Sequence, residues 1–261
     1  MAEQHPPAII AHYHVYKNAG STVDQAIIAA VGQGNFIEID KTPRYRGEAH
    51  NLPLIRRIRE ENPGMTGFSS HTFVASAHRA TDLIALPIVF LRHPLMRLAS
   101  VYRFEAVSPP HRATRLGALA ASASFPEWLE AYLDHYDGKN YQTCILSMEE
   151  SGGHSYFTNE HPGHLGDIKV AATRLDEVAE LMGVGIVESF DSTAAPMEAR
   201  IREYFPNFSL SRPVANQTKK VEDWREELRA LERSLPKDLH ARMVTRNASD
   251  FALYHRYSEV G

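Results

Sequence analysis

Two apolar runs in the chain predict buried strands, and a helical pattern follows each of them. Residues 8–16 and 83–91 are rich in aliphatic and aromatic side chains, with the core of the second run at 87–91. Short apolar runs bounded by turn residues are typical of strands buried in a parallel sheet. After the first run, apolar side chains recur with helical spacing up to Ala30. After the second, Pro94 suits the first position of a helix that reaches about Phe104.

Weaker patterns predict the rest of the architecture. Short strands are expected at 65–70 and 184–190, loops at 35–47, around Pro109-Pro110 and at 151–166, and helices at 52–59, 112–123, 126–135, 168–181, 195–204, 221–234 and 238–257. The segment 140–148 is apolar enough to be buried. No repeat or linker divides the chain. We therefore expect one α/β domain over residues 1–261, a P-loop-like parallel sheet flanked by helices with a helical C-terminal region.

Composition narrows the classes of function. The 261 residues are 43% hydrophobic and 23% charged, with a formal net charge of −4. This charge argues against a protein built mainly to hold nucleic acid, so any basic site must be local. A single cysteine, Cys144, excludes an intrachain disulfide and a cysteine-based zinc site, which favours a reducing, cytoplasmic setting. The first residues lack the pattern of an export signal, and no apolar run is long enough for a membrane span.

The turn after the first strand has the features of an anion site. Lys17, Asn18, Ala19 and Gly20 precede Ser21 and Thr22, which open the predicted helix. The unpaired N–H groups of a helix's first turn attract phosphate or sulfate, the lysine adds charge, and the glycine allows a close approach of the backbone. The lysine precedes the glycine, so this is not a Walker A motif. A plain strand-to-helix connection is the alternative.

A second anion site is predicted after the strand that ends near residue 91. Arg92 follows this strand, and Arg97 and Ser100 share one face of the next helix. Arg92 and Ser100 could together hold one phosphate, through a guanidinium on one side and a hydroxyl on the other. The alternative is a structural arginine that binds neighbouring carbonyls, with a small packed serine.

Together, the two stretches resemble the nucleotide-binding motifs of sulfotransferases that use 3′-phosphoadenosine 5′-phosphosulfate (PAPS), in the branch that sulfates heparan and other carbohydrates and includes bacterial relatives. Residues 14–22 are similar to the 5′-phosphosulfate loop H-x-x-K-T-A-G-T-S, with Asn18 where threonine is usual. Residues 92–102 are similar to the 3′-phosphate motif R-x-P-x-x-R-x-x-S-x-Y. Residues 140–147, 184–190 and 250–254 also resemble family segments.

The resemblance implies transfer of a sulfuryl group from PAPS to a hydroxyl of a saccharide or another small molecule. It assigns Lys17 and the N–H groups of residues 18–22 to the 5′-phosphosulfate, and Arg92 and Ser100 to the 3′-phosphate. His71 is the predicted base for the acceptor, because related 2-O-sulfotransferases carry an important histidine at a similar place; a structural histidine is the alternative. Lys219 or Lys220 would fold over the nucleotide.

Two groups of histidines invite the question of a metal. His12 and His14 share one face of the first strand, and His154, His161 and His164 lie in a predicted loop. Neither group comes with a pattern of carboxylates, and the family chemistry needs no metal, so we predict none. Two other functions stay open, a P-loop kinase or NTPase and a nucleotide-binding protein without turnover. The acceptor and the oligomeric state are not predicted.

Overall fold

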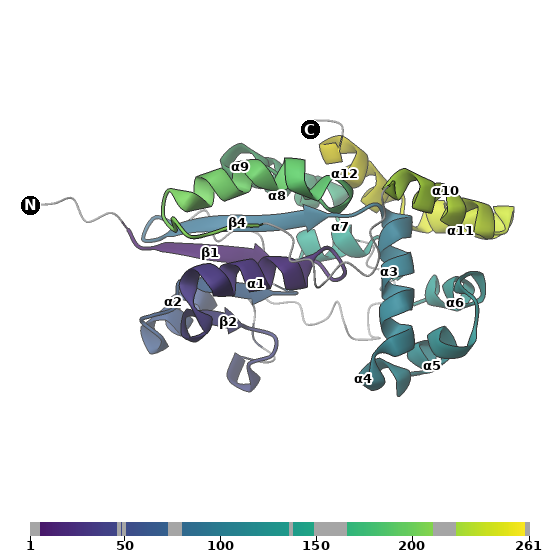
Figure 1. The fold of residues 1–261 in the computed structure, drawn as a ribbon, viewed down its shortest axis with the longest axis horizontal. Coiled ribbons are helices and arrows are strands. Elements are labelled where there is room, and N and C mark those ends of the chain that lie inside the picture. Colours follow the sequence, from purple (N-terminus) through teal and green to yellow (C-terminus); the bar gives the residue numbers. More distant parts are fainter. Residues whose placement is uncertain are drawn as a thin grey trace, which may run out of the picture.

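The two apolar runs form neighbouring parallel strands at the centre of the sheet (Figure 1). The computed structural model describes residues 6–45, 48, 51–72, 80–135, 138–148, 166–210 and 223–258. These residues form a five-stranded sheet in the order β2-β3-β1-β4-β5, with every pair parallel. The strands are β1 (Ala8–Tyr13), β2 (Phe36–Glu38), β3 (Gly67–Ser70), β4 (Ile84–Leu91) and β5 (Gly185–Ile186).

The strand order places the topological switch point of the sheet at the carboxyl ends of β1 and β4, where folds of this class have their ligand crevice. From β1 the chain builds β2 and β3 on one side, and it then crosses to β4 and β5 on the other side. Loops that leave such neighbouring strands diverge, and ligands of open α/β sheets bind in the space between them. The turn after Tyr13 and the segment after Leu91 both leave the sheet at this point. The predicted α/β fold is confirmed.

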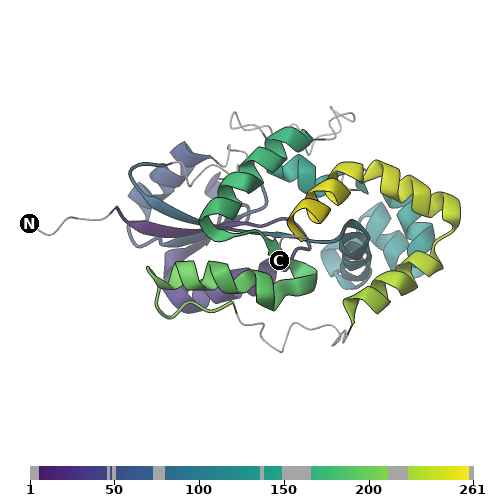
Figure 2. The same cartoon turned by 90° about the horizontal axis from the view of Figure 1, so that it is seen from above.

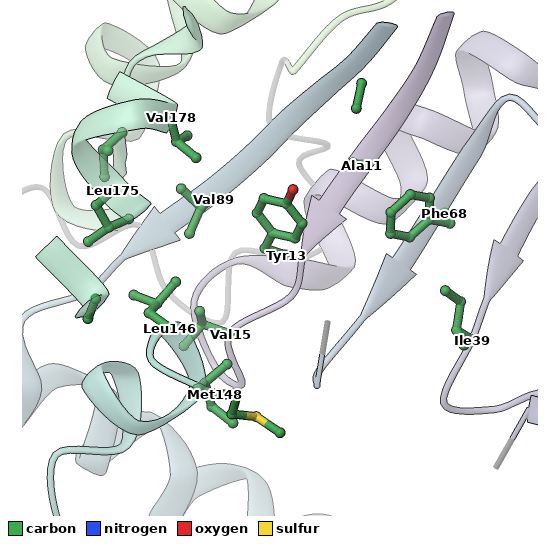
Figure 3. Packing of buried hydrophobic residues seen from close by; sticks show 14 of the residues in the cluster. Ala11, Tyr13, Val15, Ile39, Phe68, Val89, Leu146, Met148, Leu175 and Val178 are labelled. Atoms are coloured by element: carbon green, nitrogen blue, oxygen red, sulfur yellow. The ribbon is translucent and has the colours of Figure 1, made fainter. Parts of the chain in front are cut away.

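Helices cover both faces of the sheet (Figure 2). Side chains alternate along β1, so Ile9 and Ala11 pack with α2 (Leu52–Glu61) and α8 (Ile168–Met182), whereas Ile10 packs with α1 (Gly20–Val31) and α9 (Phe190–Arg202). Figure 3 shows the first of these cores, where Tyr13 and Val89 meet Leu175 and Val178 of α8. The same alternation places His12 on the face of α1.

A helical layer lies beyond the carboxyl ends of the strands. The helix α3 (Pro94–Val107) follows β4 and runs across its end (Figure 1). It packs with helices α5, α6, α10 and α11 around Trp128 and Leu129, which are fully buried. The helices of this region are α4 (Pro109–Arg112), α5 (Arg115–Ser122), α6 (Phe125–Tyr132), α7 (Tyr141–Leu146), α10 (Trp224–Ser234), α11 (Lys237–Arg246) and α12 (Ala248–Ser258).

The structure differs from the sequence prediction in several elements. Of the strand predicted at 184–190, only Gly185–Ile186 is a strand, and a 3₁₀-helix (Val187–Ser189) follows it. Phe36–Glu38 forms the edge strand β2, although the segment looked like a polar loop. Pro109 and Pro110 begin the short helix α4, because proline is compatible with the first turn of a helix. The stretch predicted as one helix at 238–257 is two, which part at Asn247. No helix among the described residues is both long and apolar enough to cross a bilayer.

Candidate anion-binding site

The turn between β1 and α1 has an unusual backbone. Lys17 has a φ of 68° and Ala19 a φ of 64°, so two non-glycine residues adopt the left-handed conformation on either side of Asn18. Alternating signs of φ turn successive N–H groups toward one concave point, an arrangement that binds anions. Each left-handed residue costs about 1–2 kcal/mol. Strain of this kind is typical of functional turns.

The amides at the start of α1 divide into two sets. The N–H of Asn18 donates to Val15 O at 3.1 Å and that of Thr22 donates to Ala19 O at 3.0 Å. Within the described part of the chain, no acceptor is found for the N–H groups of Ala19, Gly20 and Ser21, and no side chain caps the helix. These three amides, with the helix dipole behind them, form the anion cradle. The prediction of five amides is therefore too broad.

Gly20 is required for a reason that the sequence did not suggest. Its φ is not positive, and a Cβ at this position would lie 1.7 Å from His14 Nε2. The imidazole of His14 thus occupies the space of a side chain at Gly20. The glycine allows the ring of His14 to pack under the turn. The left-handed conformations of the turn are adopted by Lys17 and Ala19 and not by Gly20.

Arg92 joins the two predicted anion sites. Its Nη1 donates to the carbonyl of Lys17 at 2.9 Å, and its Nε lies 3.8 Å from Oε1 of the buried Glu188. The guanidinium lies between the turn after β1 and the 3₁₀-helix Val187–Ser189, which follows β5. The side chain of Arg92 is 17% exposed. The two segments, 75 residues apart in sequence, are therefore in direct contact.

A pair of buried amides fixes the same junction. Asn18 Nδ2 donates to Phe90 O and to Gln142 Oε1, both at 2.7 Å. Gln142 in turn accepts from the N–H of Arg92 at 3.0 Å and donates to its carbonyl at 2.9 Å. The side chain of Asn18 therefore binds the sheet edge and not the cradle. Asn18 was predicted as a cofactor-binding residue. In the structure, its side chain instead holds the turn in place.

Lys17 lies beside the cradle, against α3. Its Nζ is 4.0 Å from the centre of the Phe104 ring and 5.7 Å from that of Tyr16. Burial, together with the nearby charge of Arg92, lowers the pKa of Lys17 to about 8. A partly desolvated ammonium interacts more strongly with an anion than one in open water.

His71 also lies near Tyr16, with 6.1 Å between the two ring centres. Its Nδ1 donates to the carbonyl of His14 at 2.7 Å, and its backbone N–H donates to Asp40 Oδ2 at 2.7 Å. A carbonyl can only accept, so the proton is on Nδ1 and the lone pair is on Nε2. Burial and the neighbouring His14 lower the pKa of His71. This is the state that a general base requires at neutral pH.

The two remaining residues of the second motif differ in exposure. Arg97 is buried, with its guanidinium 4.5 Å from the centre of the Tyr141 ring, so it supports the fold around α7. Ser100 is half-buried on α3. The prediction that Ser100 holds the 3′-phosphate with Arg92 stays a prediction.

Four supporting residues were not predicted, because their contacts with the site depend on the folded structure. Asp40 orients His71, Gln142 holds Arg92, Glu188 faces Arg92 and His93, and Asp24 binds His12 and His14. Burial raises the pKa of Glu188 even with Arg92 beside it. All four stand in segments that the sequence analysis described, but none was given a role there. Lys219, Lys220, His154, His161 and His164 lie outside the described residues.

The chain was also compared with known proteins. No protein-family model matches it, and no solved structure matches it. A protein of Archaeoglobus fulgidus described as "Uncharacterized protein" is 26% identical over 263 residues, which covers 97% of this chain and 96% of that protein. The similarity thus extends over the whole chain and is not limited to one motif.

Proposed function

We propose that this protein is a PAPS-dependent sulfotransferase that acts on a hydroxyl of a carbohydrate or a related small molecule. The observation that carries the proposal is the hydrogen bond from Arg92 Nη1 to the carbonyl of Lys17. It joins two segments whose motifs, read separately, each suit one phosphate of the same doubly phosphorylated nucleotide. Both leave the sheet at its crevice, where nucleotides bind in folds of this class.

The cradle would receive the 5′-phosphosulfate. The N–H groups of Ala19, Gly20 and Ser21 are oriented for an anion, and Lys17 supplies a mobile positive charge. As the bond from sulfur to the bridging oxygen breaks, negative charge grows on the 5′-phosphate of the leaving 3′-phosphoadenosine 5′-phosphate (PAP). Donors fixed in advance around that phosphate lower the barrier, because they need no reorganisation during the reaction.

His71 would activate the acceptor. Its Nε2 takes the proton of the acceptor hydroxyl while the hydroxyl oxygen forms a bond to sulfur, opposite the leaving phosphate. The products are the sulfate ester, PAP and a protonated His71, which returns its proton to solvent. The position of His71 and Lys17, both close to the ring of Tyr16, supports this division of labour.

Calorimetry with three ligands is the first test. PAP should bind without magnesium and much more tightly than ATP, because the site offers two anion-binding segments and no Walker lysine. A screen of radiolabelled PAPS against saccharides and small alcohols should then show transfer of label. Magnesium-dependent binding of ATP alone would favour a kinase or NTPase. PAP binding without transfer to any acceptor would favour a protein that only binds the nucleotide.

A further inference from the structure

Beneath the turn, a carboxylate lies beside His12 and His14, although the sequence pattern did not indicate one. Asp24, from the second turn of α1, has Oδ1 2.6 Å from His12 Nδ1 and Oδ2 3.3 Å from His14 Nδ1. The three donor atoms lie within 4.8 Å of one another. We propose that His12, His14 and Asp24 bind a divalent transition-metal ion, for which Zn²⁺ is the probe.

The spacing of the donor atoms suits a small ion. Bonds of about 2.0–2.2 Å in a tetrahedral site place neighbouring donor atoms roughly 3.3 Å apart. The separation of His14 and Asp24 already has this value, that of His12 and Asp24 is shorter, and no separation exceeds 4.8 Å, so small side-chain movements bring the three donor atoms to this spacing. The rings of His12 and His14 stack 4.8 Å apart, at 19° to each other, so both present Nδ1 toward the same carboxylate.

The chemistry of the donor set selects the class of ion. Two imidazoles and one carboxylate suit zinc and its first-row neighbours, whereas magnesium and calcium prefer oxygen donors. Burial would raise the pKa of Asp24, but hydrogen bonds from His12 and His14 hold it below its ordinary value. Burial also lowers the pKa of His14. On metal binding, the proton on each Nδ1 moves to Nε2 of the same ring, and the freed lone pair coordinates the ion.

The environment keeps the three side chains in place. They are 1%, 15% and 11% exposed; His12 lies in β1, His14 directly after it and Asp24 in α1. Three protein ligands leave a fourth position for water, as in open zinc sites. A bound ion would clamp the end of β1 to α1, directly under Gly20 and beside His71, whose ring centre is 4.0 Å from that of His14.

The test uses the metal alone and the full chain, and it is independent of sulfotransferase activity. Metal-stripped protein is titrated with ZnCl₂ by calorimetry and against a chromophoric chelator, with MgCl₂ as the control ion. Wild type should bind one equivalent of Zn²⁺ that Asp24→Asn and His12→Gln each lose or bind at least tenfold more weakly. His93→Gln, which removes an equally buried imidazole from another element, should retain it.

Two further measurements distinguish the loss of a metal ligand from misfolding of the variant. Circular dichroism shows whether each variant keeps its helices, and X-ray absorption of the Zn²⁺-loaded wild type identifies the ligands. Two imidazole nitrogens and one carboxylate oxygen would support the site. Unchanged stoichiometry and affinity in Asp24→Asn, no binding by the wild type, or a ligand set without these imidazoles would overturn it and leave a hydrogen-bonded cluster.

Discussion

The hydrogen bonds of His71 define the first expectation at the scale of single residues. Asn at this position can still donate to the carbonyl of His14, as Nδ1 does now, but it has no basic nitrogen. We expect His71→Asn to lower kcat by about 10²–10⁴. Affinity for PAP, measured by calorimetry, should stay within a factor of about two, because asparagine keeps the hydrogen bond to this carbonyl and His71 is not one of the groups assigned to the nucleotide. A variant that sulfates at full rate would remove His71 from the mechanism.

Lys17 and His71 together predict the pH dependence of kcat/KM. The lysine must be protonated, and its pKa of about 8 means that this form is lost as the pH rises through that value. The base must be neutral, and because burial lowers the pKa of His71, its limb lies below pH 6.5. The profile should therefore be a bell with its alkaline limb near pH 8.

Two substitutions at Lys17 check this assignment. Lys17→Arg should move the alkaline limb upward, since a guanidinium does not lose its proton in this range. Lys17→Ala should reduce turnover far more than PAP binding, because the charge matters most as the leaving phosphate develops. An unmoved alkaline limb in Lys17→Arg, or near-wild-type turnover in Lys17→Ala, would contradict the role.

The sequence predicted the positively charged residues of the anion-binding site, but not the residues that fix their positions through hydrogen bonds. Lys17 and Arg92 stand beside apolar strands, so their place at the sheet edge follows from local pattern alone. Asp24 and Gln142 were missed because the contacts that each makes with the site follow from the folded structure and from no local spacing rule. The left-handed backbone at Lys17 and Ala19 was equally hidden, because lysine and alanine rarely adopt it and nothing in the sequence marks it.

At the scale of elements, the turn between β1 and α1 depends on the absence of a side chain at Gly20. A Cβ there would displace the ring of His14, so we expect Gly20→Ala to destabilise the protein by about 1–3 kcal/mol. PAP affinity should fall with it, because the amide of Gly20 belongs to the cradle. Urea unfolding and calorimetry measure the two effects.

The matched control is Gly34→Ala, where an added Cβ meets nothing within 4 Å. It should leave both quantities nearly unchanged. Combining Gly20→Ala with His14→Ala should cost less than the sum of the two single effects, since the clash exists only when both side chains are present. Strict additivity would mean that the ring of His14 does not set the requirement for glycine.

Periodicity predicted long elements better than short ones. The helix α2 follows the predicted apolar face of Leu54, Ile55 and Ile58, all of which are buried. The strand β1 ends three residues before the predicted limit at residue 16. The prediction was too long because Val15 is also apolar, although it packs in the core from a position beyond the strand. The edge strand β2 has three residues, too few for any alternation to be recognised.

At the scale of the whole molecule, the C-terminal helix supports the crevice through one buried carboxylate. Asp250 of α12 accepts hydrogen bonds from the N–H of Gln142 at 3.1 Å, and from the N–H and hydroxyl of Thr143 at 2.8 and 2.7 Å. It also faces the charge of the buried Arg97. Gln142 is the residue that binds Asn18 and Arg92. The end of the chain is thus connected to both anion-binding segments.

This connection predicts that a residue outside the nucleotide site affects PAP binding through the residues that it holds in place. Asp250→Ala leaves donors of α7 and the charge of Arg97 without a carboxylate, so the free energy of unfolding should fall by about 3–5 kcal/mol. Affinity for PAP should also fall, although Asp250 is fully buried, because Gln142 loses its anchor. Asp238→Ala, an exposed carboxylate at the start of α11, should change neither. A destabilised Asp250→Ala protein that binds PAP with wild-type affinity would show that the turn and Arg92 hold their geometry without α12.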